Sequence, residues 1–422
     1  MKKNNSLKPQ IRFKGYEDEW QQAKVREVFN LGNGYTPSKA VSAYWINGTI
    51  PWFRMEDIRE NGRVLANAIQ HVTPSAVKSS GLFPAGSIIV STTATIGEHA
   101  LLIADSLANQ RFTVFQTVNR WSWLKANYLL YRFYGLGDWC RRNVNAGGLA
   151  AVNISDLQKY DIDYPKEETE RDSIAEYFSN LDTQIKEAKR EVDRLEKMKI
   201  ASLQKMFPRP GATTPEIRFA GFSDPWKNKR LGEIMNVGSV KRIHQEDWRN
   251  AGVRFLRARD IVAELKGEKI DDKLYIDYKL YEEFSAISGK VEVGDLLVTG
   301  VGTIGIPYLV KDTEPIYFKD GNIIWFKNSN YLDGNFFFYS FIAAPIQDFI
   351  LMSSTVGTVG TYTIESGKST PITIPSLAEQ RAIGEYFLNL DELIAAKRKS
   401  IVKLRNIKKA CLSKMFVNDT KL

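Results

Sequence analysis

The sequence predicts an α/β (α+β) fold in which two globular domains with mixed sheets are separated by two long antiparallel coiled-coil helices. Three observations predict it. The chain has 422 residues, which is longer than one ordinary core and suits two domains. Several segments recur along the chain in the same order. Two charged segments carry an apolar residue every three or four positions, as amphipathic helices do.

The repeated segments identify the chain as an internal duplication. The four pairs are PQIRFKG and PEIRFAG, PWFRMEDI and RFLRARDI, TATIG and VGTIG, and the final segments 170–207 and 379–416. The final segments share 16 identities in 38 aligned positions without a gap, which chance does not produce. We therefore expect two copies of one fold, related by an internal pseudo-two-fold axis.

Between the repeated segments, each copy has a variable body rich in β-branched and aromatic runs bounded by turn residues. These runs predict strands of a mixed sheet, at 86–92, 112–117, 294–299 and 322–326, and a few helices such as 123–133. The apolar run FFFYSFIAAPI, at 336–346, is too short to span a membrane and contains Pro345. It therefore predicts a buried helix.

The two final segments each predict a helix of nearly 40 residues, about 55–60 Å long at ~1.5 Å per residue. A helix with a single apolar stripe needs a partner, and its own repeat is the obvious one. A near two-fold axis would pair the helices antiparallel, with the two bodies at opposite ends. The residues expected to pair the helices or dock a partner are Leu181, Ile185, Val192, Leu195, Leu390, Ile394, Ile401 and Leu404.

The expected domain boundaries follow from these patterns. The linker PRPGATTP contains three prolines and a glycine, which end the first long helix and begin the second copy. The expected segments are a first globular domain at 1–167, a first long helix at 168–207, a linker at 208–216, a second globular domain at 217–376 and a second long helix at 377–417.

Composition restricts the class of protein. The net charge of +9 and the pI near 9.2 are compatible with a polyanion partner, although many proteins reach this charge without one. Cys140 and Cys411 do not have a metal-ligand spacing, and the N-terminal MKKNNSLKPQ lacks the apolar core of a secretory signal. We therefore expect a cytoplasmic protein without a disulfide framework.

The sequence offers no convincing site for catalysis. The segment SGKST, at 366–370, lacks the first glycine of a phosphate-binding loop because position 362 is tyrosine. Asp182, Glu187 and Lys189 imitate the carboxylates and lysine of a nuclease, but they lie on the charged face of a predicted helix. The three histidines stand singly. We expect no catalytic residue, no metal and no cofactor on this chain.

Polar, basic and glycine-containing loops recur at matching places in both bodies. Arg and Lys neutralise phosphates, and Asn, Gln and Arg bind base edges, so the set favours nucleic acid. Each loop by itself could equally be a turn between strands. The candidate DNA-binding residues in these loops include Thr95, Arg141, Arg142 and Thr355.

Three of these patterns together resemble the specificity subunit of type I restriction–modification enzymes, over the whole chain. They are the openings PQIRFKGYEDEW and PEIRFAGFSDPW, the TATIG and VGTIG turns, and the helix entry PSLAEQRAI at 375–383. The first copy departs from this pattern, because PKEETER, at 165–171, has no glutamine where the second copy has Gln380.

The resemblance implies two target recognition domains, each reading one half of a split sequence in double-stranded DNA. It also implies long helices that dock two methyltransferase subunits and set the spacer, with restriction subunits joining them. S-adenosylmethionine and ATP with Mg would be bound by those partners. The residues that the resemblance places near DNA are Tyr35, Thr36, Lys39, Thr93, Asn109, Gln110, Arg111, Lys241, Arg242, Thr303, Lys319 and Asn322. Thr93 stands where many members of the family carry a basic residue.

Two other functions are compatible with the same sequence. The chain could be a stand-alone two-domain DNA-binding protein, or a coiled-coil scaffold that brings proteins together without nucleic acid. A fused methyltransferase would need cofactor motifs that this chain lacks.

Overall fold

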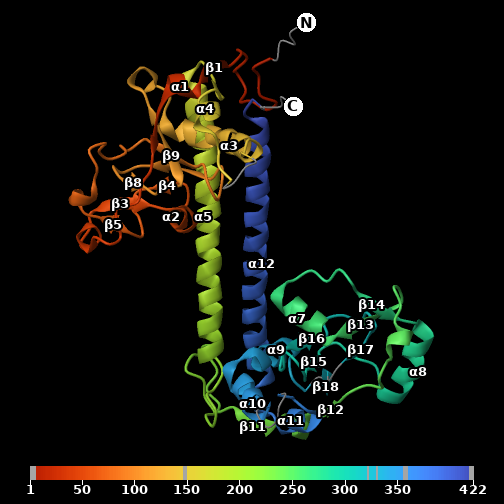
Figure 1. The fold of residues 1–422 in the computed structure, drawn as a ribbon. Helices are drawn as coiled ribbons and strands as arrows, with labels where there is room; N and C mark the ends of the chain where they lie inside the picture. The colour runs from red at the N-terminus through yellow and green to blue at the C-terminus, as the bar shows by residue number, and fades with distance from the viewer. Residues whose placement is uncertain (1–5, 146–149, 321–322, 329–330, 355–359, 418–422) are drawn as a thin grey trace. The chain divides into compact units, whose positions relative to one another are not determined.

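The computed structural model describes residues 6–145, 150–320, 323–328, 331–354 and 360–417 (Figure 1). The chain divides into two compact units, the first formed by 1–187 with 400–422 and the second by 188–399. Each unit receives one part of each long helix, α5 (Glu168–Lys205) and α12 (Leu377–Lys414), which have 38 residues each. The predicted class, an α/β fold with mixed sheets and two long helices, is confirmed.

The described residues of the first unit form three small sheets, with strand orders β2-β9-β6-β7-β4, β5-β3-β8 and β1-β10. The pairs β3–β8 and β4–β7 are parallel and the others antiparallel, so the sheets are mixed. The strands are β1 (Gln21–Lys24), β2 (Phe29–Asn33), β3 (Ile50–Phe53), β4 (Val64–Leu65), β5 (His71–Val72), β6 (Ile88–Ser91), β7 (His99–Leu102), β8 (Leu107–Ala108), β9 (Phe112–Thr117) and β10 (Asp161–Tyr164).

The helices of the first unit place an aromatic core against the start of α5. They are α1 (Val25–Val28), α2 (Met55–Asn61), α3 (Ala126–Arg142), α4 (Ile154–Leu157) and the first part of α5. Tyr131 of α3 stacks on Phe178 of α5 with ring centroids 5.2 Å apart, and Phe178 stacks on Phe416 at 5.9 Å. Phe178 is fully buried, so the segment EYFSNLD at 176–182, which recurs as EYFLNLD at 385–391, packs α5 against its own body.

The second unit repeats this topology although its body differs in sequence. The order β12-β18-β15-β16 reproduces β2-β9-β6-β7, parallel β13–β17 reproduces β3–β8, and β11–β19 reproduces β1–β10. The strands are β11 (Lys227–Arg230), β12 (Asn236–Gly238), β13 (Val253–Arg257), β14 (Leu274–Ile276), β15 (Leu296–Thr299), β16 (Pro307–Leu309), β17 (Ile316–Asp320), β18 (Ile323–Lys327) and β19 (Pro371–Ile374).

The helices of the second unit correct one prediction. They are α6 (Leu231–Ile234), α7 (Ala258–Lys266), α8 (Tyr278–Ser288), α9 (Gly334–Ile342), α10 (Ala344–Ser354), α11 (Ile364–Ser369) and the first part of α12. The run 336–346 is not one buried helix, because the chain bends by 56° between α9 and α10. Pro345 lies in the first turn of α10, where its missing N–H removes no helical hydrogen bond.

In the part of the chain that the structure describes, no single helix is long and apolar enough to cross a membrane. The bent pair α9 and α10 meets the length and composition requirement only when both helices are taken together. Phe336, Phe337 and Phe341 of this pair are fully buried inside the second unit.

Within each unit, the parts of α5 and α12 run antiparallel. In the first unit Asp182 bonds Lys408, and Tyr177 Oη lies 3.3 Å from Cys411 Sγ. In the second unit Lys199 Nζ donates to Asp391 at 2.6 Å, and Ser202 Oγ lies 3.0 Å from Tyr386 Oη. Of the predicted pairing residues, Leu404 is half-buried and the others are buried, namely Leu181, Ile185, Val192, Leu195, Leu390, Ile394 and Ile401.

Candidate nucleic-acid interface

Loops from three parts of the first unit converge on one cleft of about 270 Å³. The loops follow β2 and β3 and join β8 to β9. The cleft is lined by Thr36, Lys39, Trp52, Arg54, Met55, Glu56, Asn109, Gln110, Arg111 and Phe112. Five residues predicted to bind DNA are thus brought together, namely Thr36, Lys39, Asn109, Gln110 and Arg111.

Backbone hydrogen bonds hold these loops in contact. Tyr35 N donates to Ala108 O at 2.7 Å, and Asn109 N donates to Phe53 O at 2.9 Å. Gly34 lies so close to the β8–β9 loop that an added Cβ would be only 2.1 Å from Asn109 O, so this position requires glycine. The loops that form the cleft are therefore anchored by backbone hydrogen bonds to each other and to the strands.

The side chains at the cleft present both donors and acceptors. Asn109 Nδ2 donates to Thr36 Oγ1 at 3.4 Å, and the Thr36 hydroxyl donates to the side-chain oxygen of Gln110. Arg111 N donates to Asn109 Oδ1 at 3.0 Å, while its guanidinium is exposed. Lys39 is exposed as well. Two cations thus flank a pair of amides, which is the chemistry of a surface that binds phosphates and base edges.

Tyr35 does not line the cleft. Its hydroxyl donates to Ala76 O at 3.3 Å and accepts from Lys78 N at 3.0 Å. Lys78 Nζ lies 4.4 Å from the centre of the Tyr35 ring. Tyr35 therefore joins the loop after β2 to the segment 76–78, and Lys78, which sequence reasoning missed, is an exposed cation that contacts this tyrosine.

The TATIG turn adjoins the cleft, because Thr92 N donates to Arg111 O at 3.1 Å. Thr93 and Thr95 are half-buried in this turn, and Ser91 Oγ donates to Thr93 O at 2.7 Å. Gly97 packs on α3 so closely that a Cβ would lie 2.3 Å from Gly137 O. The TATIG turn is therefore fixed in place between the cleft and α3.

The predicted residues Arg141 and Arg142 lie at the end of α3 and are exposed. Arg141 forms an ion pair with Asp138, and its Nη1 donates to Ile96 O at 3.4 Å. Arg142 Nε donates to Asp138 O at 3.4 Å. Both guanidiniums thus have partners on the protein, whereas the Arg111 guanidinium has no hydrogen-bond partner among the described residues.

His99 follows the TATIG turn and is buried. One ring nitrogen lies 2.9 Å from Leu130 O, and the other lies 3.4 Å from Arg63 Nη1. Burial, reinforced by the charge of Arg63, lowers the pKa of His99 to about 3. His99 is therefore neutral at physiological pH and joins the turn to α3.

In the second unit the structure describes only part of the predicted set. Lys241 and Arg242 are exposed in the loop after β12, and Lys241 Nζ lies 3.9 Å from the centre of the Phe284 ring. Thr303 is exposed in the VGTIG turn. Asn322 and Thr355 lie outside the described residues, and for Lys319 only the backbone, in β17, is described.

The cleft also contains residues that sequence reasoning missed, Arg54 and Glu56. A signal for them was present, because Arg54 belongs to PWFRMEDI, which recurs as RFLRARDI. The repeat itself concealed the difference between the two copies, because Arg54 faces the cleft and its counterpart Arg257 is buried.

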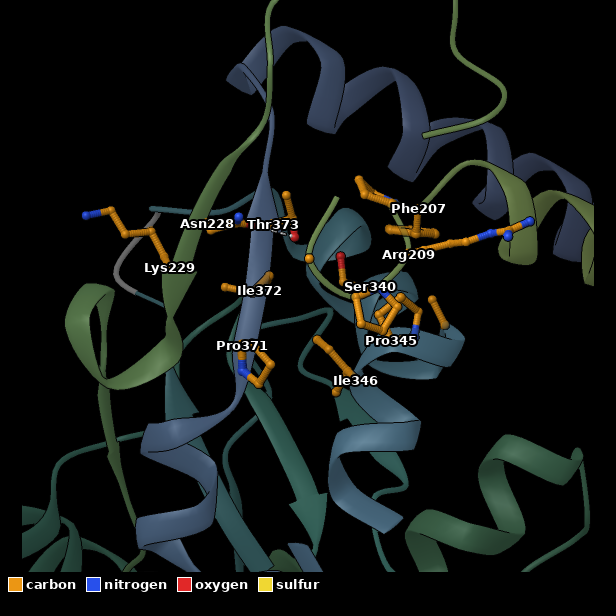
Figure 2. A pocket seen from close by; sticks show the side chains of 14 residues that line it. Phe207, Arg209, Asn228, Lys229, Ser340, Pro345, Ile346, Pro371, Ile372 and Thr373 are labelled. Carbon is orange, nitrogen blue, oxygen red and sulfur yellow. Dashed lines mark hydrogen bonds between the residues drawn. The ribbon is translucent and has the colours of Figure 1, made fainter. Parts of the chain in front are cut away.

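A second cavity, of about 290 Å³, lies in the second unit between the linker, β11–β19 and the α9–α10 bend (Figure 2). Phe207, Pro345 and Ile372 supply apolar surface, and Asn228 and Thr373 bond each other at 3.1 Å. This cavity is built on the repeated framework rather than on the variable loops. No group of three or more His, Cys, Asp or Glu side chains within the described residues is arranged to hold a metal ion.

Comparison with known proteins identifies relatives of the chain. It is 44% identical over 162 residues to the type I restriction enzyme EcoprrI specificity subunit of Escherichia coli, a match that covers 38% of this chain and 40% of the relative. A putative type I restriction enzyme specificity subunit of Haemophilus influenzae is 30% identical over 154 residues, covering 36% and 37%. Each match thus spans less than half of the relative.

Two solved structures share the fold over nearly the whole chain. The S subunit of a type I restriction–modification system from M. genitalium aligns with a TM-score of 0.59 at 15% identity, covering 98% of this chain and 100% of the other. A protein from a study of complex assembly and conformational transition of the type I R-M system aligns with a TM-score of 0.55 at 17% identity, covering 95% and 98%.

The domain family described as "Type I restriction modification DNA specificity domain" matches the chain twice, at residues 17–197 and 223–406. The two matches correspond to the two copies of the duplicated fold and together cover most of the chain. The chain therefore belongs to the family of type I restriction–modification DNA specificity subunits.

Proposed function

We propose that this chain is the non-catalytic DNA-reading subunit of a type I restriction–modification complex, in which each half reads one part of a bipartite DNA site. One observation carries the proposal. The variable loops of the first unit converge on a cleft with exposed cations and paired amides, while the framework that holds them is repeated in the second unit. Two different reading surfaces on one repeated frame are what a site with two unlike halves requires.

The long helices would dock two methyltransferase subunits and set the spacer between the half-sites. Apolar side chains that remain exposed on these helices support docking, since Ile200 is 57%, Leu393 43% and Val402 55% exposed. We further propose that S-adenosylmethionine and ATP with Mg are bound by the methyltransferase and restriction subunits, and that the complex acts on DNA in the cytoplasm.

The test is to co-express the chain with its methyltransferase subunit and to map modified bases in the host DNA. The proposal predicts a single bipartite motif with a fixed spacer. Host DNA without a motif that depends on this chain would contradict it.

Gel shifts at two salt concentrations separate the two other functions. A stand-alone DNA-binding protein would bind its site tightly without partners, with the steep salt dependence of phosphate contacts. A protein scaffold would show no salt-dependent DNA binding. The proposed subunit would bind weakly until methyltransferase subunits are added.

A further inference from the structure

The duplication supplies an internal comparison for Arg54, whose counterpart in the second unit is Arg257. Arg257 is 6% exposed, and its guanidinium donates to Asp260 at 2.9 Å and also to Asp272 O at 2.8 Å. Its charge is thus neutralised inside the second unit, where it ties β13 to α7. Arg257 is a structural residue.

The corresponding carboxylate in the first unit has a different partner at one of its oxygens. Asp57, which corresponds to Asp260, accepts from Arg54 N and from Ile69 N, each at 2.7 Å. The Arg54 guanidinium makes no hydrogen bond to the part of the chain that the structure describes, and its Nε is buried. Among the described residues, this guanidinium has one ion pair, a long one in which Nε lies 3.9 Å from a carboxylate oxygen of Glu56.

A rigid aromatic platform holds Arg54 at the cleft. Its guanidinium carbon lies 5.6 Å from the centre of the Trp52 ring, a cation–π distance. Trp52 is almost fully buried, and its Nε1 donates to Tyr35 O at 2.9 Å. Trp45 packs edge-on against it with ring centroids 5.0 Å apart. Arg54 therefore presents unused donors from a fixed position.

Glu56 indicates what those donors meet. It lines the same cleft as Arg54, Lys39 and Arg111, and it is exposed. A carboxylate repels phosphate, so a cleft that only held the DNA backbone would be weakened by it. A carboxylate does accept hydrogen from the amino group of cytosine, while arginine donates to O6 and N7 of guanine.

We propose that Arg54 and Glu56 determine base specificity in the half-site that the first unit reads, where Arg54 donates to a guanine and Glu56 accepts from the N4 amino group of a cytosine. This assignment rests on the proposed function. Asn109 and Gln110, which line the same cleft, would contact the neighbouring base pairs, and Lys39 and Arg111 the phosphates.

The experiment compares four variants of the full chain, each co-expressed with the methyltransferase subunit and analysed by modified-base mapping. Arg54→Gln and Glu56→Gln each remove the charge of one proposed base-reading side chain with little change of size. Arg59→Gln and Glu60→Gln are matched controls, because both residues are exposed on α2, which begins directly after Arg54 and contains Glu56, and neither lines the cleft. Thermal unfolding of each variant checks that the first unit is intact.

The expected result is a change at defined positions of one half-site. Arg54→Gln and Glu56→Gln relax the requirement for a G·C pair by roughly 5- to 150-fold, which is the discrimination of one good base contact. The other half-site, the spacer and both control variants keep the wild-type motif. Because Glu56 is exposed, Glu56→Gln tests the proposal even if Arg54→Gln unfolds the unit.

Two results would overturn the assignment. An unchanged motif in folded Arg54→Gln and Glu56→Gln would show that the pair does not read bases. An equal loss of methylation at all sites, with no relaxation, would assign the pair to general DNA binding. Failure of the proposed function would look different, because the wild-type chain itself would then direct no bipartite motif. In that case the assignment of Arg54 and Glu56 fails as well.

Discussion

At the scale of single residues, the repeated opening segments are explained by one buried ion pair. Arg12 donates to both oxygens of Glu170, at 2.6 and 2.8 Å, and to Asp18 O at 2.6 Å. In the second unit Arg218 donates to Glu379 at 2.7 and 2.8 Å and to Asp224 O at 2.7 Å. The IRF motif therefore recurs because its arginine fastens the opening segment to the start of the long helix.

Removal of Glu170 should destabilise the first unit strongly. Glu170 is 1% exposed, so Glu170→Ala leaves the Arg12 guanidinium without its carboxylate in a largely buried site. We expect a loss of about 3–5 kcal/mol in the free energy of unfolding, measured by urea denaturation. Glu176→Ala, at an exposed position of the same helix, should change it by less than about 0.5 kcal/mol. Equal effects of the two substitutions would contradict this account.

Another residue pair shows a limit of sequence comparison. The first copy lacks the glutamine found at Gln380, yet both long helices begin at equivalent positions, Glu168 and Leu377. Arg171 replaces Gln380, because its Nη1 donates to Lys166 O at 2.7 Å and Gln380 Nε2 donates to the equivalent carbonyl, Pro375 O, at 3.1 Å. The two long helices thus begin in the same way although their sequences differ, because Arg171 and Gln380 both donate to a backbone carbonyl just before the helix.

His99 makes the stability of the first unit depend on pH. Its folded pKa of about 3 lies below the usual 6.5, so between these values the unfolded chain binds a proton that the folded unit does not. Stability therefore rises with pH across this window and is lost as the pH falls. We expect a loss of about 2 kcal/mol between pH 7 and pH 5, measured by urea denaturation.

His99→Gln removes the titrating group and keeps a donor for Leu130 O. The variant should lose most of the pH dependence between pH 7 and pH 5. A pH dependence as steep as that of the wild type would assign the effect to other groups.

At the scale of elements, the TATIG and VGTIG turns have the same backbone in two different sequences. Gly97 N donates to Ser91 O at 2.8 Å, and Gly305 N donates to Thr299 O at 2.7 Å. The second residue of each turn has a left-handed backbone, with φ of 63° at Ala94 and 71° at Gly302. Alanine adopts this conformation with strain, whereas glycine does not.

Exchange of the two residues should therefore have opposite effects. Ala94→Gly relieves the strain, and Gly302→Ala introduces it at a position where no other atom lies near the added Cβ. We expect changes of about 0.5–1 kcal/mol in the free energy of unfolding, stabilising for Ala94→Gly and destabilising for Gly302→Ala. Denaturation of the two single variants measures this, and effects of the same sign would show that turn strain is not the cause.

Elements were easier to predict than the cleft, for a physical reason. The strand at 112–117 and the long helices have local apolar periodicities, and the structure confirms them as β9, α5 and α12. The cleft depends on the parallel pairing of β3 with β8, which are far apart in sequence. No local pattern specifies that pairing. The repeated motif PWFRMEDI and RFLRARDI likewise does not specify the surroundings of its arginine, which lies at the cleft as Arg54 and in a buried network as Arg257.

At the scale of the whole molecule, both units contain the same backbone hydrogen bond between an opening segment and the end of a long helix, but the two bonded residues are close in sequence in only one unit. Ile217 N donates to Lys205 O at 3.0 Å in the second unit, where the intervening linker joins the two residues. Ile11 N donates to Lys414 O at 2.9 Å in the first unit, although these residues lie near the two ends of the chain. The duplication therefore reproduces complete units, each built from both long helices.

Reciprocal ion pairs set the register of those helices. Lys408 of α12 bonds Asp182 of α5 within the first unit, and Lys199 of α5 bonds Asp391 of α12 within the second. Each aspartate also accepts from a tyrosine of its own body, Tyr131 at 3.2 Å and Tyr339 at 2.8 Å. Within each unit, the same carboxylate thus contacts both the partner helix and the body.

Lengthening both helices should lengthen the DNA spacer. Two helical turns, about seven residues, inserted after Glu187 in α5 and between Lys399 and Ser400 in α12 leave all four of these ionic residues in their own units. At ~1.5 Å per residue and ~3.4 Å per base pair, the spacer should grow by about three base pairs while both half-sites stay unchanged. Modified-base mapping of the variant measures this.

The same insertion in α5 alone leaves α12 without matching residues, so it should abolish or weaken methylation. Full activity of the doubly lengthened variant on the original spacer would exclude the helices as the ruler.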